Sequence, residues 1–420
     1  MAKDAAPWTH TLETQDGPVS VSGRVAPGFE AVAEAFCANF TERAEAGAAV
    51  HAQHRGREVV SLSGGRIASP EDADAAPRFW SDDTICVIFS ATKPATALCM
   101  HLLSQRGQVD LDAPVGAVWP AFAAQGKEQI TLRMVLDHSA GIPVLCEPLK
   151  TDCLCDHAYM AERLAAATPV FAPGRTTAYH PVTGGFVLAE VLRRVDGRSL
   201  GRFFAEEIAQ PLGLDFWIGL PDALEERVAP IRHFVPQKGG GSTPFGEALR
   251  DPGSPQSRFF FNHGDWMAKG VNTRAGRRAE IGAASGVTNA RNLAALFEAM
   301  RPDGLLGLDV ETVASFAQAT SATHRDGMLL QPTRFGPGFM LRMDNRGGQG
   351  RTPRGDSFLI PPQAFGHVGA GGSFGFRDPA ADLSMAYTMT QMGPGFLLNP
   401  RGQTLIDAAY RCISAAAPQP

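Results

Sequence analysis

Residues 84–107 of the chain, TICVIFSATKPATALCMHLLSQRG, change character after the first six positions. Those six are rich in β-branched and apolar side chains, which predicts a short strand. From Ser90 onward the pattern favours a helix that has Pro94 in its first turn and ends at Gly107. Ser90 and Lys93 therefore lie three positions apart at the start of a helix, on one face.

This Ser-x-x-Lys pair has the residue types that nucleophilic catalysis needs. A lysine buried beside a helix N-terminus loses solvation and lies in a positive dipole, so its pKa falls. The neutral amine of Lys93 is then able to accept the proton of Ser90 and activate its oxygen as a nucleophile. The pair also fits an ordinary helix start with a solvated lysine, so the interpretation depends on the rest of the chain.

Apolar periodicity predicts several helices around this junction. They are expected over about 28–46, from 130, over 182–197, from 289 to 300 after a cap at Thr288 or Asn289, and close to the C-terminus. Strands are expected on both sides of a turn at Arg55-Gly56 and of another at Asp378-Pro379. Residues 232–265, rich in Gly, Pro, Ser and Phe, predict a long irregular segment of the type that often walls an active site.

Two further stretches carry residues suited to the same chemistry. Tyr179 lies in TTAYHPVTGGFVL, just before a predicted helix. Much later, AFGHVGAGGSFGF places His367-Val368-Gly369-Ala370 directly before the C-terminal pair of strands. Its glycines would let the backbone approach a ligand closely.

With these motifs in this order, the chain resembles the serine hydrolases of the class C β-lactamase fold, which include penicillin-binding proteins and family VIII carboxylesterases. The resemblance covers roughly residues 30–415 and extends to phrases between the motifs. These are DLDAPV (110–115), ITLRMVLDHSAGIP (130–143), YHPVTGGFVLAEVLRRVDGRSL (179–200), RRAEIGAASGVTNARNLAALFEAM (277–300) and GHVGAGGSFGFRDP (366–379).

The resemblance implies an α/β (α+β) fold of the β-lactamase/transpeptidase type, an antiparallel sheet flanked by helices. The sheet part is expected in residues 1–85 and 275–420, and a mainly helical part in 86–274. The active site would then lie in the cleft between the two parts.

The resemblance also implies roles for single residues. Ser90 matches the family nucleophile, Lys93 its base partner, and Tyr179 the tyrosine that moves a proton between Ser90 and the leaving or attacking group. The backbone N–H groups of Ser90 and Ala370 match the oxyanion hole. No metal or organic cofactor is expected.

Substrate-binding positions follow from the same alignment. His367 and Gly369 occupy the place of the family's Lys-Thr-Gly motif, and His180, next to Tyr179, is a candidate for the wall of the site. The chain departs from the family pattern at Pro181, which replaces an asparagine, and at His367, which replaces a lysine. Those two family side chains help to hold a β-lactam, so the substitutions favour the esterase branch.

The expected activity is therefore that of a carboxylesterase acting through an acyl-Ser90 intermediate. A transacylase that moves the acyl group to an alcohol or amine uses the same residues and is the second hypothesis. A β-lactamase or D-peptidase, and a non-catalytic scaffold with this fold, are the remaining alternatives. The partners expected are a small acyl substrate and an acyl acceptor; the oligomeric state stays open.

A rival nucleophile is present in Gly371-Gly372-Ser373-Phe374-Gly375, which fits the G-x-S-x-G elbow of α/β-hydrolases. That motif needs a helix after the serine and a histidine further along the chain. Pro379 interrupts any helix, and all 11 histidines lie at or before position 367. Ser373 is therefore expected to be a strand residue beside the site.

Asp137-His138 suggests a Ser/His/Asp triad, but a turn histidine is the preferred interpretation because Lys93 and Tyr179 already fill the base roles. Phe259 to Phe261 and Trp266 are expected to line the pocket or the core rather than to form a stacking platform.

Four soft ligands, Cys146, Cys153, Cys155 and His157, lie within twelve positions and are a weak candidate for a zinc site. Their spacing lacks a Cys-x-x-Cys pair, so a loop with free thiols is expected instead.

The composition narrows the class of partner and the compartment. A net charge of −5 and the absence of a basic run argue against nucleic-acid binding. The first residues have no apolar segment of the secretory type, and no stretch of 18 apolar residues predicts a membrane span. Seven irregularly spaced cysteines fit a reducing compartment, so a cytoplasmic location is expected.

Overall fold

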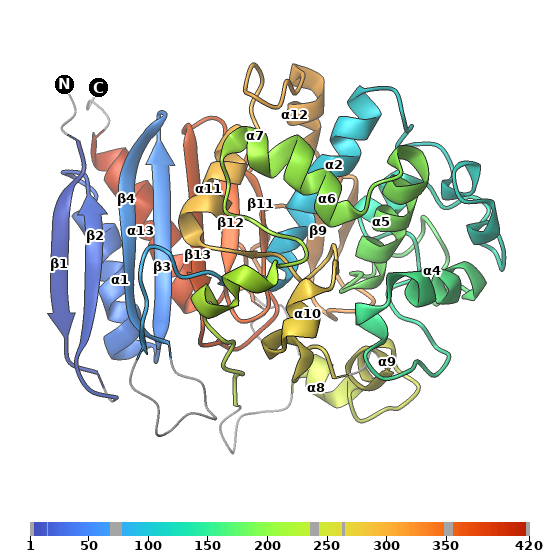
Figure 1. Ribbon diagram of the computed structural model, residues 1–420, viewed down its shortest axis with the longest axis horizontal. Coiled ribbons are helices and arrows are strands. Elements are labelled where there is room, and N and C mark those ends of the chain that lie inside the picture. The colour runs from blue at the N-terminus through green and yellow to red at the C-terminus, as the bar shows by residue number, and fades with distance from the viewer. Residues whose placement is uncertain are drawn as a thin grey trace.

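The computed structural model describes residues 4–14, 16–67, 78–235, 243–262, 265–347 and 356–416. Within them, one antiparallel sheet of eleven strands runs through the molecule. Its strand order is β1-β2-β4-β3-β13-β12-β11-β10-β9-β8, and β5 pairs with β4 beside that path. Figure 1 shows this sheet.

Strands from the two ends of the chain form the two sides of the sheet, β1 to β5 on one side and β8 to β13 on the other. They are β1 (Ala6–Leu12), β2 (Val19–Val25), β3 (Gly47–His54), β4 (Arg57–Ile67), β5 (Arg78–Phe79), β8 (Ser321–Thr323), β9 (Thr333–Gly336), β10 (Phe339–Met340), β11 (Phe365–Val368), β12 (Phe374–Asp378) and β13 (Leu383–Met389). The join is the pairing of β3 with β13, which runs from Ala48 opposite Met389 to His54 opposite Leu383. The expected antiparallel sheet of the β-lactamase/transpeptidase type is confirmed.

Helices cover both faces of this sheet. On one face, Phe36 of α1 (Glu30–Glu42) meets the ring of Tyr387 edge-on at 6.4 Å, and α1 packs against the C-terminal helix α13 (Pro400–Ala416). On the other face lies α11 (Ala290–Ala299), so close that a side chain on Gly375 would meet Phe297 at 2.4 Å. The core thus extends over both sides of the central strands.

The middle of the chain is mainly helical. Its α-helices are α2 (Lys93–Gln105), α3 (Leu132–Leu136), α4 (His157–Ala166), α5 (Thr183–Asp196), α6 (Leu200–Phe204), α7 (Gln210–Leu212), α8 (Pro244–Ala248), α9 (Pro255–Asn262) and α10 (Arg274–Arg278), and α12 (Val310–Phe316) follows later. In Figure 1, α2 lies between the sheet and α5. In the part of the chain described, no helix is long and apolar enough to cross a membrane.

Most expected elements lie where the sequence placed them. The turn at Arg55-Gly56 joins β3 to β4, and the side chain of Asn289 caps α11 by accepting the N–H of Asn292 at 3.0 Å. The expected turn at Asp378-Pro379 lies between β12 and β13.

Two expectations need correction. The strand expected before Ser90 is only β6 (Cys86–Val87), paired with β7 (Val287–Thr288), because a 3₁₀ turn takes over at Phe89. Residues 232–265 are not irregular throughout, since α8 and α9 form within them; part of this segment, 236–242 and 263–264, lies outside the described residues.

Candidate active site

Ser90 lies in a 3₁₀ turn, Phe89–Thr92, that leads directly into α2. The residue before it, Phe89, has a φ of 48°, a left-handed conformation that is uncommon for a bulky side chain. Its buried ring packs edge to face against Trp266 at 6.3 Å, which fixes this conformation. Backbone strain of this kind clusters at functional sites, and here it directs Ser90 into a pocket.

Lys93 is the first residue of α2 and is buried. Its Nζ lies 3.1 Å from Ser90 Oγ, 2.9 Å from the carbonyl oxygen of Pro181 and 3.1 Å from that of Ala283. Burial lowers the pKa of Lys93 well below its usual value. A neutral amine that donates its two hydrogens to these carbonyls keeps its lone pair directed at Ser90, which is the arrangement a general base needs.

Tyr179 completes this group from the loop before α5. Its phenol lines the same pocket as Ser90, and Lys93 Nζ lies 4.7 Å from the centre of its ring. Burial raises the pKa of Tyr179, so the phenol keeps its proton at neutral pH. The structure therefore brings Ser90, Lys93 and Tyr179 together, with a neutral base and a phenol in the same site.

Asp326 holds the backbone of Tyr179 in place and was not found by sequence reasoning. Its buried carboxylate accepts the N–H of Tyr179 at 3.0 and 3.1 Å, and also those of Met328 at 2.7 Å and Leu329 at 2.8 Å. The Thr333 hydroxyl donates to it at 3.0 Å. The Asp-Gly pair at 326–327 signals a turn, but nothing in the sequence indicates a partner 147 positions away.

The glycine-rich segment forms a turn after β11 that lies against the residues before Ser90. A side chain on Gly369 would meet the carbonyl oxygen of Ile88 at 2.1 Å, so only glycine fits there. Ala370 lines the same pocket as Ser90. Among the described hydrogen bonds, none uses the N–H of Ala370, which leaves it available to a ligand. Ser90, at the start of the 3₁₀ turn, has no acceptor for its N–H within that turn.

His367 and His180 lie behind Lys93 and Tyr179 rather than on the wall of the pocket. His367 Nδ1 lies 2.7 Å from the carbonyl oxygen of Val368, and its ring is 6.2 Å from that of Tyr179. His180 accepts the N–H of Ile142 at 3.2 Å and borders a small second cavity next to Lys93. Burial lowers the pKa of each histidine to about 3, so both are neutral. Gly369, too, is not among the residues that line the pocket beside Ser90.

Within the described part of the chain, the residues of the alternative catalytic hypotheses, Asp137, His138 and Ser373, form no hydrogen bond with Ser90. The Nδ1 of His138 accepts the N–H of His180 at 3.2 Å, and Asp137 accepts the Ser139 hydroxyl at 2.7 Å, so they form no relay to Ser90. Ser373 is buried in the segment between β11 and β12, with no helix after it.

The thiol cluster is also spread out. Cys146 and Cys155 are exposed, Cys153 is buried, and the ring of His157 pairs with Glu190 at 3.1 Å. Among the described residues, no three such side chains are grouped to hold a metal ion.

The pocket next to Ser90 encloses about 620 Å³ of empty space, part of it open to solvent, and its wall is almost entirely apolar. Only Ser90 and Tyr179 among its lining residues carry polar side chains. The apolar wall is rich in Phe and Met: Phe89, Phe245, Phe259, Phe260, Phe396, Met267 and Met328. Residues 232–265, the segment expected to wall the site, thus supply several of these rings. Trp266 is instead buried in the core, and Phe261 is exposed.

Comparison with known proteins agrees with this geometry. The family model described as Beta-lactamase matches residues 32–409. Over 389 residues the chain is 34% identical to Esterase/beta-lactamase LipL of Mycobacterium tuberculosis, covering 89% of this chain and 85% of that protein.

Two solved structures resemble the whole molecule. One is a penicillin-binding protein homologue from Caulobacter crescentus and the other a family VIII carboxylesterase. Each has a TM-score of 0.77 and 33% sequence identity, and each match covers 93% of this chain and 99% of the other. The chain therefore belongs to the beta-lactamase family, and it is a serine hydrolase.

Proposed function

We propose that this protein is a carboxylesterase that hydrolyses neutral esters with an apolar acyl group through an acyl-Ser90 intermediate. The observation that carries the proposal is the pocket beside Ser90, whose lining offers Phe, Met and other apolar side chains and no charged one. Burying an apolar acyl group there is favourable, whereas a charged group would lose its solvation without a partner.

Acylation uses the three residues that meet at Ser90. Neutral Lys93 takes the hydroxyl proton while Ser90 Oγ attacks the ester carbonyl carbon, and the N–H groups of Ser90 and Ala370 stabilise the resulting oxyanion. Collapse of the tetrahedral species breaks the bond to the alkoxide, which receives a proton from Tyr179. Lys93 returns its proton to Tyr179, and the acyl group remains on Ser90.

Deacylation runs through the same groups in reverse. A water molecule enters where the alcohol left and attacks the acyl carbon, while its proton goes to Tyr179 as Tyr179 passes its own proton to Lys93, which later returns it to Ser90. Ser90 regains its proton and the carboxylic acid leaves. Besides Lys93, whose Nζ lies 3.1 Å from Ser90 Oγ, this scheme needs only Tyr179 and the Ala370 N–H, and both residues line the same pocket as Ser90.

Pro181 and His367, which stand where the family has an asparagine and a lysine, make a β-lactam a poor substrate in this proposal. The carbonyl oxygen of Pro181 accepts a hydrogen bond from Lys93 Nζ, and the proline ring has no side-chain amide to offer a substrate. His367 is buried and neutral, so it supplies no charge to the carboxylate of a β-lactam.

Acyl transfer to an alcohol or amine is a second candidate, favoured by the same apolar wall. An acceptor with an apolar body gains free energy from this pocket, and water does not. Decay of the acyl-enzyme that accelerates with added alcohol and yields the new ester would identify the transferase.

The test compares p-nitrophenyl esters that differ only in the acyl group. A neutral butyrate ester is expected to be turned over with a much higher kcat/KM than the hemisuccinate ester, which carries a carboxylate, and than a chromogenic cephalosporin. Ser90→Ala should lower kcat/KM by about 10⁴-fold or more. Ser373→Ala is the matched control for the rival serine and should retain activity. Equal rates on the neutral and anionic esters would overturn the proposed specificity.

A further inference from the structure

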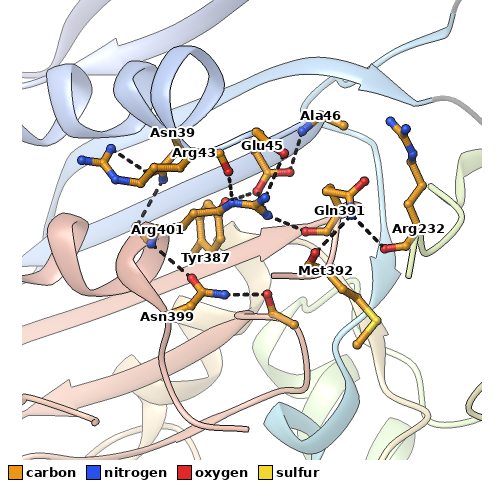
Figure 2. A network of polar contacts seen from close by, with 12 residues as sticks. Asn39, Arg43, Glu45, Ala46, Arg232, Tyr387, Gln391, Met392, Asn399 and Arg401 are labelled. Carbon is orange, nitrogen blue, oxygen red and sulfur yellow. Dashed lines mark hydrogen bonds and ion pairs between the residues drawn. The ribbon is translucent and has the colours of Figure 1, made fainter. Parts of the chain in front are cut away.

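We propose that Asn399 is a positioning residue that fixes the turn 369–372 and thereby the Ala370 N–H beside Ser90; this inference rests on the proposed function. Asn399 lies immediately before α13 and is only 4% exposed. It contacts the turn from the side away from the pocket. Figure 2 shows its amide between the turn and the first residues of α13.

The side-chain amide of Asn399 uses both of its ends. Nδ2 donates to the carbonyl oxygen of Gly371 at 2.9 Å, and Oδ1 accepts the backbone N–H of Arg401 at 3.1 Å. The same Gly371 oxygen accepts the N–H of Gly393 at 2.8 Å. The Gly371–Gly372 peptide is therefore held by two donors at its carbonyl, and Asn399 is the one that belongs to a side chain.

Two backbone hydrogen bonds close the turn, from the Gly372 N–H to the Gly369 oxygen at 3.0 Å and from the Gly369 N–H to the Ser373 oxygen at 2.6 Å, but the Gly371 carbonyl takes part in neither. Gly371 and Gly372 have φ values of 88° and 123°, a region where glycine is favoured and where no side chain restricts the backbone. A side chain on Gly372 would lie 2.6 Å from Asn399 Nδ2, and one on Gly393 would lie 2.4 Å from it. The amide thus fills a space between two glycines, and its removal leaves the turn with both space and freedom to move.

Asn399 is itself attached, through Arg401, to a buried network of hydrogen bonds. The buried guanidinium donates to the carbonyl oxygens of Arg43 and Ala44, each at 2.8 Å, and to that of Gln391 at 2.6 Å. It also pairs with Glu45 at 3.1 Å, as Figure 2 shows. These contacts do not involve the Asn399 side chain, so the hydrogen-bond network of Arg401 should persist when that side chain is changed.

This arrangement matters for catalysis because oxyanion stabilisation depends strongly on geometry. Donors have to be held within about 0.5 Å of their productive position to act on the transition state. The Ala370 N–H belongs to the Gly369–Ala370 peptide, two peptide units before the one that Asn399 holds. A shift of that peptide should therefore weaken the oxyanion contact while leaving the apolar pocket, and so ground-state binding, almost unchanged.

The test is Asn399→Asp, which keeps the oxygen that accepts from Arg401 but replaces the donor with an oxygen facing the Gly371 carbonyl. Asn399→Ala is the second variant, because it removes the donor without adding a charge. Gln403→Glu is the matched control. Gln403 lies one turn further along α13, and its amide bonds the N–H and carbonyl of Leu359, at 3.0 and 3.1 Å, away from the turn.

The readout is kcat/KM for a neutral ester divided by that for the corresponding thionoester, whose sulfur accepts hydrogen bonds poorly. Both Asn399 variants are expected to lose about tenfold or more in kcat on the ester with little change in KM, and the ester-to-thionoester ratio should fall. Gln403→Glu should leave the ratio at the wild-type value.

An unchanged ratio in both Asn399 variants, with an active wild type, would overturn this inference and leave the proposed function standing. The same holds if the two substrates lose rate equally, because a merely structural defect has that effect. If the wild-type protein turned over neither substrate, the proposed function itself would fail, and this inference with it.

Discussion

Lys93 illustrates at the residue scale how a charge-conserving substitution changes the chemistry. Arginine stays protonated in proteins, so Lys93→Arg keeps a cation beside Ser90 but removes the base. We expect kcat/KM on a neutral ester to fall by about 10³-fold or more. Lys127→Arg is the matched control, because Lys127 is also buried and donates to backbone carbonyls, at 2.9 Å from Ala124 and 3.1 Å from Ala165. Activity of Lys93→Arg near that of the control would contradict the assignment.

The protonation of Lys93 should also set the acid side of the pH profile. Its pKa is well below the usual value because the amine is buried, and only the unprotonated form accepts the proton of Ser90. As pH falls through that pKa, Lys93 gains a proton and kcat/KM should decrease. The pKa values of His180 and His367 are about 3, so these neighbours do not produce this limb. Measurement of kcat/KM against pH tests this, and a rate that rises as pH is lowered would contradict it.

The lowered pKa of Lys93 also makes the free energy of unfolding depend on pH. The folded state holds Lys93 with a lowered pKa, so it binds fewer protons than the unfolded chain between that pKa and about 10.4. The contribution of Lys93 to the free energy of unfolding therefore rises with pH over this window.

Residue types and spacing indicated Ser90 and Lys93 as a candidate pair, because the two lie three positions apart at a helix start, and the resemblance to a family turned the pair into a prediction. Tyr179 and the turn at Ala370 came only from the resemblance to a family, since no spacing links them to Ser90. Asp326 and Asn399 escaped prediction for another reason. Both act through hydrogen bonds to distant backbone groups, and such bonds leave no periodic pattern in the sequence.

At the scale of elements, the turn that begins at Asp326 connects the helical part of the site to the strand β9. Asp326→Ala removes the acceptor of several buried N–H groups, and we expect the free energy of unfolding to fall by about 3 kcal/mol or more. Asp309→Ala is the control, because Asp309 caps α12 at an exposed position, where the loss should be about 1 kcal/mol. Urea unfolding measures both, and equal losses would show that Asp326 is an ordinary cap.

Elements were predicted well where one face is buried and poorly where it is not. α11 has the regular apolar spacing of a half-buried helix and was expected from its cap onward. β1 and β2 were not expected. β1 is mostly exposed at the edge of the sheet and lacks a clear alternating pattern, whereas β2, VSVSGRV, alternates buried and exposed residues and was missed although the sequence carries that signal. The 3₁₀ turn at Phe89 also left no signal, because its left-handed backbone is imposed by packing against Trp266.

At the scale of the whole molecule, the buried pair of Glu45 and Arg401 joins the two ends of the chain. Tyr387 from the central strand β13 donates to the same carboxylate at 2.5 Å. Arg401→Met leaves a buried carboxylate without its cation, so we expect a loss of about 3–5 kcal/mol in the free energy of unfolding. In Glu45→Gln/Arg401→Met the charge is absent, and stability should partly recover. Additive losses in this double-mutant cycle would show that the two side chains are not coupled.

The fold as a whole was predictable because the helical block interrupts a sheet whose strands lie at both ends of the chain. The pairing of β3 with β13 has this origin. The register and the short strands β8 to β10 were not predictable, since they have few residues and depend on contacts made only in the folded molecule.

Intact-protein mass spectrometry after rapid acid quench tests most directly whether Ser90 carries the acyl group. During turnover of p-nitrophenyl butyrate, the wild-type protein should gain the mass of one butyryl group, located on the peptide that contains Ser90. Ser90→Ala should gain none, and Ser373→Ala should behave as the wild type. An adduct on any other residue, or full turnover by Ser90→Ala, would contradict the mechanism.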